Sequence, residues 1–433
     1  MNEAAFVLVR ARTEGGVAAP PVNSTQTPAG PASHPTVDRP EVPIDISIPD
    51  VQELPEEEIR LANQPPGNVA FLNVLTNALG HDLQAFSVWG ASSITNLPLT
   101  KPHKRPKVGV AGLAQSVNPT TSKEPSRVLS IMREFSMDNR DVPWWVNELR
   151  QAIGDDLYLV IVDHTGFEIP WELVRLPASQ SGAETYLGAA VSTARWHYMR
   201  DYKTYKQLLL KVRDEEHAGS VAAFVDLQGL PRGAADSRVL TELNATIEQS
   251  LKQLEDRLTR PEAGFGLIYL ACHGHDAPSI EEFALGSASK TGERLVLGLL
   301  HEREYHLFFE QSNAIVFINA CHSGRMLMED EHLKTEFLRG FPGLFLGKGA
   351  AGIIGTTGFI NDAFAAKMAD WLFRILRTTD EPISKLLRQW RAAVLERQPT
   401  APSESDKVEL LNAFMYVYYG NPLSRLRIAE GSS

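Results

Sequence analysis

Two stretches of sequence decide the fold of this chain: LIYLACHGH at residues 267–275 and AIVFINACHSG at residues 314–324. Each begins as a run of apolar residues, which predicts a buried strand of a parallel sheet. Each then reaches a reactive side chain with glycine close behind it, His273 in the first stretch and Cys321 in the second. A thiol and an imidazole at one edge of a sheet make a nucleophile and its base.

The rest of the chain repeats this alternation of strands and helices. Further strands are predicted at 157–163, 167–174, 221–226, 351–356 and from residue 414, and the first two are expected to form a hairpin or a strand-turn-strand unit. Apolar residues at helical spacing predict helices at 56–90, 127–137, 144–150, 240–258, 341–348, 362–376 and 383–397. Strands separated by helices indicate an α/β sandwich of three layers, with a mostly parallel sheet between helices. Functional groups in such sheets gather at the carboxyl ends of the strands.

Composition excludes several classes of protein. The formal charge of -11 and a pI near 5.6 argue against direct nucleic-acid contact and against binding to an anionic membrane. The basic residues around 101–107 are interpreted as a solvated loop. The N-terminal residues are not expected to act as a signal peptide, because an acid stands where lysines are usual and the apolar run is short. No run is apolar enough to predict a membrane helix, and two cysteines predict no disulfide framework. A cytoplasmic protein is expected.

Three regions are predicted along the chain. Residues 1–55 hold an apolar run at 6–9, read as either a docking strand or a frayed tail, and a flexible linker. The linker is marked by eight of the 27 prolines of the chain. Residues 56–140 are expected to form a small accessory or regulatory region. Residues 141–430 are expected to form the domain that carries the chemistry.

The glycines beside the reactive residues fit peptide-bond chemistry. Gly274 lets the backbone turn away from His273, so that its N–H and the N–H of Cys321 could face a developing oxyanion. A zinc site is disfavoured because adjacent residues at a strand end, such as Cys272 and His273, point to opposite sides. A phosphate loop is disfavoured because Lys348 stands at the start of the glycine-rich run 347–358 and no Gly-Lys-Ser/Thr opens a helix there. No metal or cofactor is expected.

Four segments together resemble the CHAT family, caspase-like cysteine peptidases of bacteria grouped with caspases, separases and gingipains. They are FEIPWELV at 167–174, ACHG at 271–274, NACHSG at 319–324 and VYYGNPL at 417–423. The resemblance implies a caspase-like sandwich and a catalytic dyad, with His273 as general base and acid and Cys321 as nucleophile. It also implies Gly274 and Cys321 as oxyanion donors. Its biological association is with bacterial defence, including antiviral defence, and regulated cell death.

The resemblance further suggests a pocket for the substrate residue before the cut. In this group the residue that ends the first core strand often lines that pocket, and here it is Asp226, with Asp276 and Asp362 as reserve candidates. An acid there would favour arginine or lysine. The alternative is that Asp226 only caps a loop. Residues 326–340 are read as either a processing site or a solvated loop.

The leading hypothesis is therefore a cysteine endopeptidase that cuts a protein substrate once a partner or signal activates it. The alternative is a non-catalytic caspase-like scaffold that binds peptides or assembles a complex, since a fold does not guarantee activity.

Overall fold

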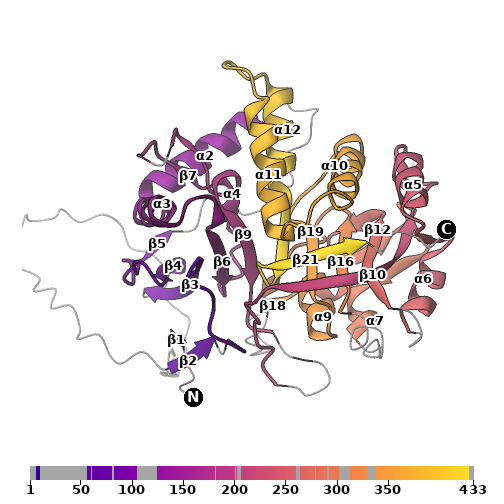
Figure 1. Ribbon diagram of the computed structural model, residues 1–433, viewed down its shortest axis with the longest axis horizontal. Coiled ribbons are helices and arrows are strands. Elements are labelled where there is room, and N and C mark those ends of the chain that lie inside the picture. The colour runs from indigo at the N-terminus through magenta and orange to yellow at the C-terminus, as the bar shows by residue number, and fades with distance from the viewer. Residues whose placement is uncertain are drawn as a thin grey trace, which may run out of the picture.

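The computed structural model describes residues 6–9, 56–59, 61–79, 82–104, 124–180, 182–199, 201, 206–259, 264–277, 279–289, 292–301, 313–328 and 338–428. Within these residues, twelve strands join into one sheet (Figure 1). Across the sheet they run β11 (Thr246–Glu248), β10 (Glu215–Val225), β12 (Phe265–Ala271), β16 (Ile315–Asn319), β19 (Gly352–Thr356), β20 (Tyr416–Gly420), β9 (Ser192–Trp196), β6 (Tyr158–Asp163), β3 (Val69–Leu79), β4 (Asp82–Ala91) and β5 (His103–Lys104). The twelfth strand, β21 (Ser424–Ile428), pairs with β10.

The two stretches that carry the reactive residues are neighbouring parallel strands. β12 pairs with β16 from Leu267 opposite Ile315 to Ala271 opposite Asn319. Every residue of both strands is buried, which explains their unbroken apolar runs. Because the strands are parallel and in register, the residues that follow them emerge at the same edge of the sheet.

Helices cover both faces of this sheet. One apolar core lies between the sheet and α2 (Glu124–Asp138), α3 (Asp141–Ile153), α5 (Gly233–Glu242), α10 (Asp362–Ile375), α11 (Ile383–Glu396) and α12 (Glu404–Met415). The second core lies between the sheet and α6 (Leu251–Leu258), α7 (Leu297–His301) and α9 (Phe341–Gly347). The strands divide their side chains between the cores: Tyr269 packs in the first, and Cys272, just beyond the end of β12, in the second. The predicted three-layer fold with a mostly parallel sheet is confirmed.

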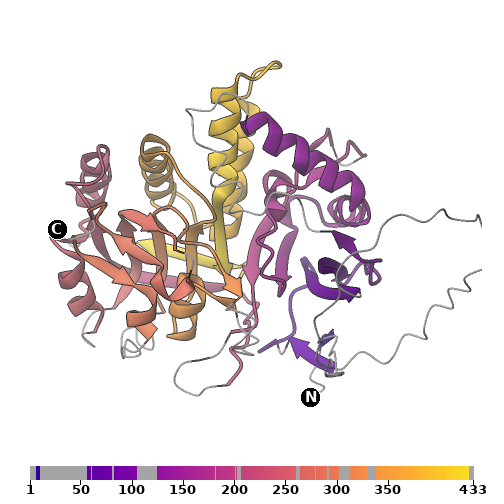
Figure 2. The same ribbon diagram turned by 180° about the vertical axis from the view of Figure 1, so that it is seen from behind.

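The prediction of helix at residues 56–90 is wrong. Val69–Leu79 forms β3, which pairs parallel with β6 and antiparallel with β4. The structure buries every residue from 69 to 74, and a strand buried on both faces has no polar alternation to distinguish it from a helix. Strands β3, β4 and β5 extend the same sheet. In Figure 2 they lie, in indigo, at one end of the sheet, and β10 and β12 lie toward the opposite end. The division at residue 141 stays a prediction, although the sheet crosses it.

The prediction of one helix at residues 240–258 is also wrong. The chain forms α5, then the short edge strand β11, then α6. Asn244, at a φ of +53°, follows the end of α5, and the Ser250 side chain accepts a hydrogen bond from the Gln253 N–H to cap α6. Leu240 packs in the first core and Leu251 in the second, so the leucines that looked like one stripe cover opposite faces of the sheet.

The 167–174 segment does not form the predicted strand. It holds a short 3-10 helix at Trp171–Leu173, followed by the two-residue strand β7 (Arg175–Leu176). Pro170 has no N–H to give to a ladder, and the polar side chains of the segment make buried contacts instead. The predicted helices at 127–137, 144–150, 341–348, 362–376 and 383–397 lie in α2, α3, α9, α10 and α11.

The remaining predictions have mixed outcomes. Phe6–Val9 forms β1 and pairs antiparallel with β2 (Glu56–Ile59), while the linker lies outside the described residues. So do residues 105 and 107 of the basic group and most of the 326–340 segment, of which β17 (Leu327–Met328) and β18 (Leu338–Arg339) are described and pair. None of the helices in the described parts of the chain has both the length and the apolar character to span a membrane.

Candidate active site

His273 follows β12 and begins the short strand β13 (His273–His275). Its Nε2 atom lies 3.0 Å from the backbone carbonyl oxygen of Gly229, in the loop after β10. A carbonyl oxygen only accepts hydrogen bonds, so Nε2 carries the proton and donates. In the neutral ring Nδ1 then keeps its lone pair, which is what a general base requires.

Cys321 lies just beyond β16 with a largely buried thiol. The Ile360 N–H donates a hydrogen bond to Sγ over 3.4 Å, and Sγ lies 3.8 Å from the Ile360 carbonyl oxygen, to which the thiol donates. Burial raises the pKa of the Cys321 thiol, although the Ile360 backbone opposes the shift. In this arrangement the thiol is held in its neutral form.

Gly274 brings the two segments into contact. A Cβ atom at this position would lie 1.7 Å from the carbonyl oxygen of Cys321 and 3.0 Å from its nitrogen. No side chain fits in that space, so only glycine lets the two backbones approach this closely. His273 and Cys321 therefore lie on segments that touch at Gly274.

Asp226 follows β10 and lies beside the loop that contacts the imidazole. Its Oδ1 atom accepts a hydrogen bond from the Gly229 N–H over 2.9 Å, so the capping contact of the alternative prediction is present. Its Oδ2 atom is buried and has no hydrogen-bond partner among the described residues. A Cβ atom on Gly229 would lie 2.3 Å from this oxygen and 3.0 Å from His273 Nε2. Asp226 thus lies close to the imidazole, with its pocket role still a prediction.

The two reserve acids lie in different settings. Asp276 follows β13, is 50% exposed, and its Oδ2 atom lies 3.7 Å from Nη1 of Arg325. Asp362 begins α10, and its Oδ2 atom accepts a hydrogen bond from the Arg232 N–H over 2.9 Å. Of the two, Asp276 is adjacent in sequence to the predicted base segment.

Sequence reasoning missed an unusual feature of His322. This side chain is buried, its φ angle is +60°, and its ring packs edge-on against Phe359 with centroids 4.5 Å apart. Both ring nitrogens lack hydrogen-bond partners among the described residues. Burial lowers the pKa of His322 to about 4, so the ring is neutral at physiological pH. Its position next to Cys321 was the available signal.

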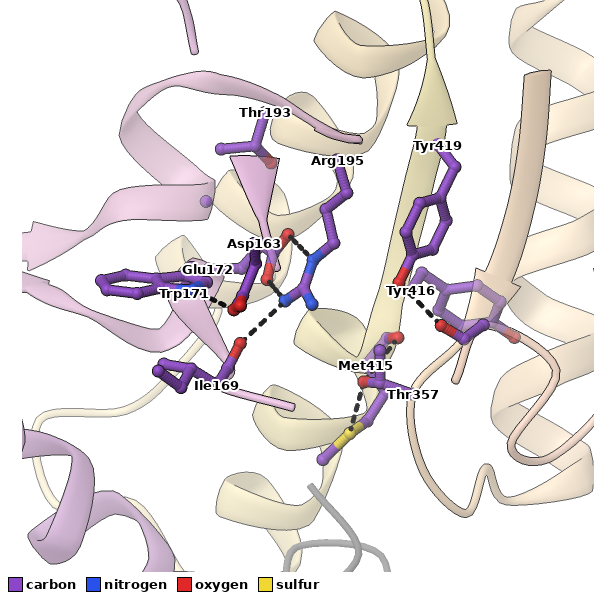
Figure 3. Close-up of polar contacts among 12 residues, drawn as sticks. Asp163, Ile169, Trp171, Glu172, Thr193, Arg195, Thr357, Met415, Tyr416 and Tyr419 are labelled. Carbon is purple, nitrogen blue, oxygen red and sulfur yellow. Dashed lines mark hydrogen bonds and ion pairs between the residues drawn. The ribbon is translucent and has the colours of Figure 1, made fainter. Parts of the chain in front are cut away.

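Sequence reasoning also missed a group of buried ionic contacts beside the site. Figure 3 shows the Arg195 guanidinium against Glu172, with Nε donating to Oε1 over 3.0 Å, and against the Ile169 carbonyl oxygen. Nearby, Trp171 Nε1 donates to Asp163 over 3.0 Å. Burial raises the pKa of Glu172, but Arg195 outweighs it and lowers the pKa below its ordinary value. These contacts hold the 167–174 segment against β6 and β9.

The glycine-rich run at 347–358 packs tightly within the sheet. A Cβ atom at Gly355 would lie 2.9 Å from Cα of Gly324, and one at Gly352 would lie 2.4 Å from the Tyr418 hydroxyl oxygen. Both contacts are made with β20 or with the segment after β16, so here the small residues allow close packing between strands and their following segments. Over the residues that the structure describes, no three His, Cys, Asp or Glu side chains are grouped closely enough to hold a metal ion.

Comparison with known families gives one match that covers most of the chain. A family model described as CHAT domain matches residues 155–416. This range is more than half of the 433 residues and contains His273, Gly274 and Cys321. No curated protein matches the chain.

Solved structures show weaker similarity. The complex of the pro- and mature domains of RgpB from Porphyromonas gingivalis is 15% identical, with a TM-score of 0.41, over 67% of this chain and 70% of that one. Two structures of the separase–securin complex from Saccharomyces cerevisiae are 12% and 14% identical, with TM-scores of 0.37 and 0.36. They match 62% and 63% of this chain, which spans only 16% and 15% of theirs.

Proposed function

The chain belongs to the CHAT domain family, and from that premise we propose that it is a cysteine endopeptidase acting through His273 and Cys321. The contact between Gly274 and the Cys321 backbone is the observation that carries the proposal. It makes the base segment and the nucleophile segment neighbours at the carboxyl edge of the sheet, where a peptide bond can meet both groups.

The proposed reaction proceeds in two steps. Nδ1 of His273 accepts the thiol proton as Sγ of Cys321 bonds to the substrate carbonyl carbon, and the N–H groups of Gly274 and Cys321 stabilise the oxyanion. The imidazolium then gives its proton to the leaving amine as the C–N bond breaks, which leaves a thioester. Water then attacks the thioester and gives a proton to His273, the C–S bond breaks to release the carboxylic acid product, and the imidazolium returns its proton to Sγ of Cys321.

We propose that the described structure is a resting state. The thiol interacts with the Ile360 backbone, and burial raises its pKa, so little thiolate exists before activation. A partner or signal that moves the Ile360 loop would free Sγ to approach His273. Bacterial defence or regulated cell death, the association of the family, is the proposed setting.

Substrates with a basic residue before the cut are proposed on the basis of the nearby acids. Asp226 has one buried oxygen without a described partner, and Asp276 is half exposed beside the base segment. A carboxylate in a cleft favours arginine or lysine by charge pairing. Asp362, which receives a backbone hydrogen bond, is the third candidate.

Proteome digestion tests the peptidase proposal. The chain would be incubated with native cell extract, which can supply the activating partner or signal, and new peptide termini would be identified by mass spectrometry. Wild type and Cys272→Ala, which changes the thiol packed in the second core, are expected to create the same termini. His273→Ala is expected to cut about a hundredfold to ten-thousandfold more slowly, and Cys321→Ala to lose cleavage. Equal cutting by all four proteins would contradict the dyad.

The second candidate is a non-catalytic scaffold that binds peptides or assembles a complex. The neutral, backbone-bonded thiol is the observation that favours it. A scaffold would bind a peptide equally well as wild type and as the Cys321→Ala variant, and neither protein would release a product from it. Binding measured by fluorescence anisotropy, together with product analysis, distinguishes the two functions.

A further inference from the structure

Arg325 lies shortly after Cys321 and contacts three separate segments of the chain. Its Nε atom donates to Oε1 of Glu168 over 2.6 Å, and its Nη2 atom donates to Oε2 over 2.9 Å. Its Nη1 atom lies 3.7 Å from Oδ2 of Asp276, and its Cζ atom lies 5.4 Å from the centre of the Phe283 ring. One side chain therefore joins segments that are far apart in the sequence.

Two of these contacts lie on the side of the predicted base. Asp276 directly follows β13, which begins at His273. Phe283 directly precedes β14 (Ala284–Gly286), the strand that pairs with β13. Arg325 itself belongs to the segment of Cys321. The guanidinium consequently connects the segment of the base with the segment of the nucleophile.

The third contact anchors this connection to the other half of the sheet. Glu168 belongs to the 167–174 segment, which the proposed reaction leaves without a role. Its φ angle is +53°, a left-handed conformation that a glutamate rarely adopts and that persists only where the surroundings impose it. The two hydrogen bonds to Arg325 are among the contacts that hold Glu168 there.

We propose that Arg325 is a positioning residue that fixes the segments of His273 and Cys321 relative to each other, with Glu168 as its anchor. This inference rests on the proposed function for its catalytic meaning. Neither side chain reaches the reacting atoms in the proposed reaction, so both act through the segments they hold.

Burial and geometry explain why an arginine serves here. The Arg325 side chain is 7% exposed and that of Glu168 is 10% exposed, so water competes little for their hydrogen bonds. The planar guanidinium uses Nε and Nη2 for Glu168 and still presents Nη1 to Asp276. A lysine at this position has a single ammonium group and cannot hold both partners in the same fixed geometry.

The nucleophile segment has a second support that does not involve the Arg325 side chain. The Tyr419 hydroxyl of β20 donates to the carbonyl oxygen of Gly324 over 2.9 Å. The backbone N–H of residue 325 donates to the carbonyl oxygen of His322 over 3.2 Å. Loss of the Glu168 pair should therefore loosen the connection to the base segment without unfolding β16 or β20.

The test compares Glu168→Gln and Arg325→Lys with the control Glu248→Gln. Glu248 pairs with Arg257 at the sheet edge and is 11% exposed, which matches Glu168 in burial but lies on neither catalytic segment. Amide hydrogen exchange would be measured for peptides covering 264–277 and 313–328 of the full chain. Cleavage of a peptide that wild type cuts would be measured for kcat and KM separately.

The proposal predicts that Glu168→Gln and Arg325→Lys speed exchange in both peptides by about tenfold, while Glu248→Gln leaves both unchanged. It also predicts that kcat falls about tenfold or more with little change in KM, because the substrate is not contacted. Unchanged exchange of the 264–277 peptide in Glu168→Gln and Arg325→Lys would overturn the proposal, even if kcat falls in both variants. If wild type cuts nothing even in native cell extract that can supply the activator, but the exchange result holds, the proposed function fails and the positioning role stands.

Discussion

The orientation of the His273 ring depends on a residue three positions after Asp226. Gly229 accepts the hydrogen bond of Nε2 through its carbonyl oxygen, and its N–H is held by the Asp226 carboxylate. The same carboxylate is the leading candidate for the substrate pocket. Two roles for Asp226, capping the loop and selecting a basic residue, are thus compatible in one side chain and need separate tests.

Paired substitutions of Asp226 separate those roles. Asp226→Asn keeps an oxygen that accepts from the Gly229 N–H but removes the charge, so kcat should change little while the preference for arginine over a neutral residue falls about tenfold. Asp226→Ala removes the cap as well, so kcat should fall and stability should drop by about 1 kcal/mol. Steady-state kinetics on matched peptides measure the preference and kcat, and urea unfolding measures the stability. An unchanged preference in Asp226→Asn would leave Asp226 with the capping role alone.

The thiol of Cys321 should react slowly in the resting protein. Burial raises the pKa of the Cys321 thiol, and it also raises the pKa of the Cys272 thiol, which is fully buried. Iodoacetamide labelling of Cys321 should therefore rise with pH only above the ordinary thiol pKa of about 8.5, and Cys272 should stay unlabelled in the folded protein. Mass spectrometry of each cysteine peptide measures the two profiles. Rapid labelling of Cys321 at neutral pH would contradict the resting-state proposal.

A buried chain of hydrogen bonds connects α5 to strands β12, β16 and β20. Asp236 of α5 accepts from the Tyr269 hydroxyl over 2.6 Å, and the Tyr269 oxygen accepts from Nδ2 of Asn319 over 2.9 Å. The Tyr416 hydroxyl of β20 donates to Oδ1 of Asn319 over 2.7 Å. Asn319 ends β16, so this chain supports the start of the nucleophile segment.

Asp236 makes the stability of this region depend on pH. Burial raises the pKa of its carboxyl from 3.8 to about 6, so the folded state holds the proton more tightly than the unfolded state. This stabilisation is complete below pH 3.8 and is lost as the pH rises toward 6, by about 3 kcal/mol in total.

Asp236→Asn removes this dependence, because an amide still accepts from the Tyr269 hydroxyl and never ionises. At pH 7 the free energy of unfolding of the variant should exceed that of wild type, and near pH 4 the difference between the two should be smaller. Urea unfolding at both values measures the difference. A wild type that loses no stability relative to the variant between these values would show that Asp236 titrates normally.

Local pattern was enough to predict β12 and β16, but it failed for residues 240–258 and for β3. β12 and β16 are short apolar runs that end at turn residues, so their limits were evident. A single helix was predicted at 240–258 because Leu240 and Leu251 keep helical spacing. In the structure the chain crosses the sheet edge between these two residues. The sequence of β3 predicts a helix because Asn73, Thr76 and Asn77 interrupt its apolar run, so that the apolar residues between them keep helical spacing.

For the whole molecule, the two halves of the sheet meet between β20 and β9 and share a buried arginine. Arg391 of α11 is fully buried. Its Nη1 atom donates to the Gly188 carbonyl oxygen and to the Thr193 hydroxyl, both over 3.2 Å. Its Nη2 atom donates to the Tyr416 carbonyl oxygen over 2.6 Å. The guanidinium therefore links residues of both halves.

Loss of Arg391 should destabilise the whole molecule. Arg391→Met fills similar space but leaves three buried acceptors without this donor, so the free energy of unfolding should fall by about 3 kcal/mol. Arg374→Met is the control, because Arg374 is 60% exposed and pairs with Asp370 on the surface of α10. Urea unfolding compares the two. Equal, small losses would mean that the junction does not depend on Arg391.

Only part of the candidate active site could be predicted from the sequence. His273, Gly274 and Cys321 stood out because each follows a buried strand within a short motif. Glu168 and Arg325 are 157 residues apart, and no local pattern links an acid in one loop to an arginine in another. Contacts between distant loops depend on the packing of the whole sheet, which local spacing does not encode.

Covalent trapping tests whether His273 and Cys321 act as a catalytic dyad. A peptidyl chloromethyl ketone ending in arginine would be incubated with the full chain in native cell extract, which can supply the activator, and the modified cysteine would be identified by mass spectrometry. The account predicts a thioether on Cys321, none on Cys272, and a rate lower by about a hundredfold or more in His273→Ala. Equal modification of Cys321 in wild type and His273→Ala, or modification of Cys272 instead, would contradict it.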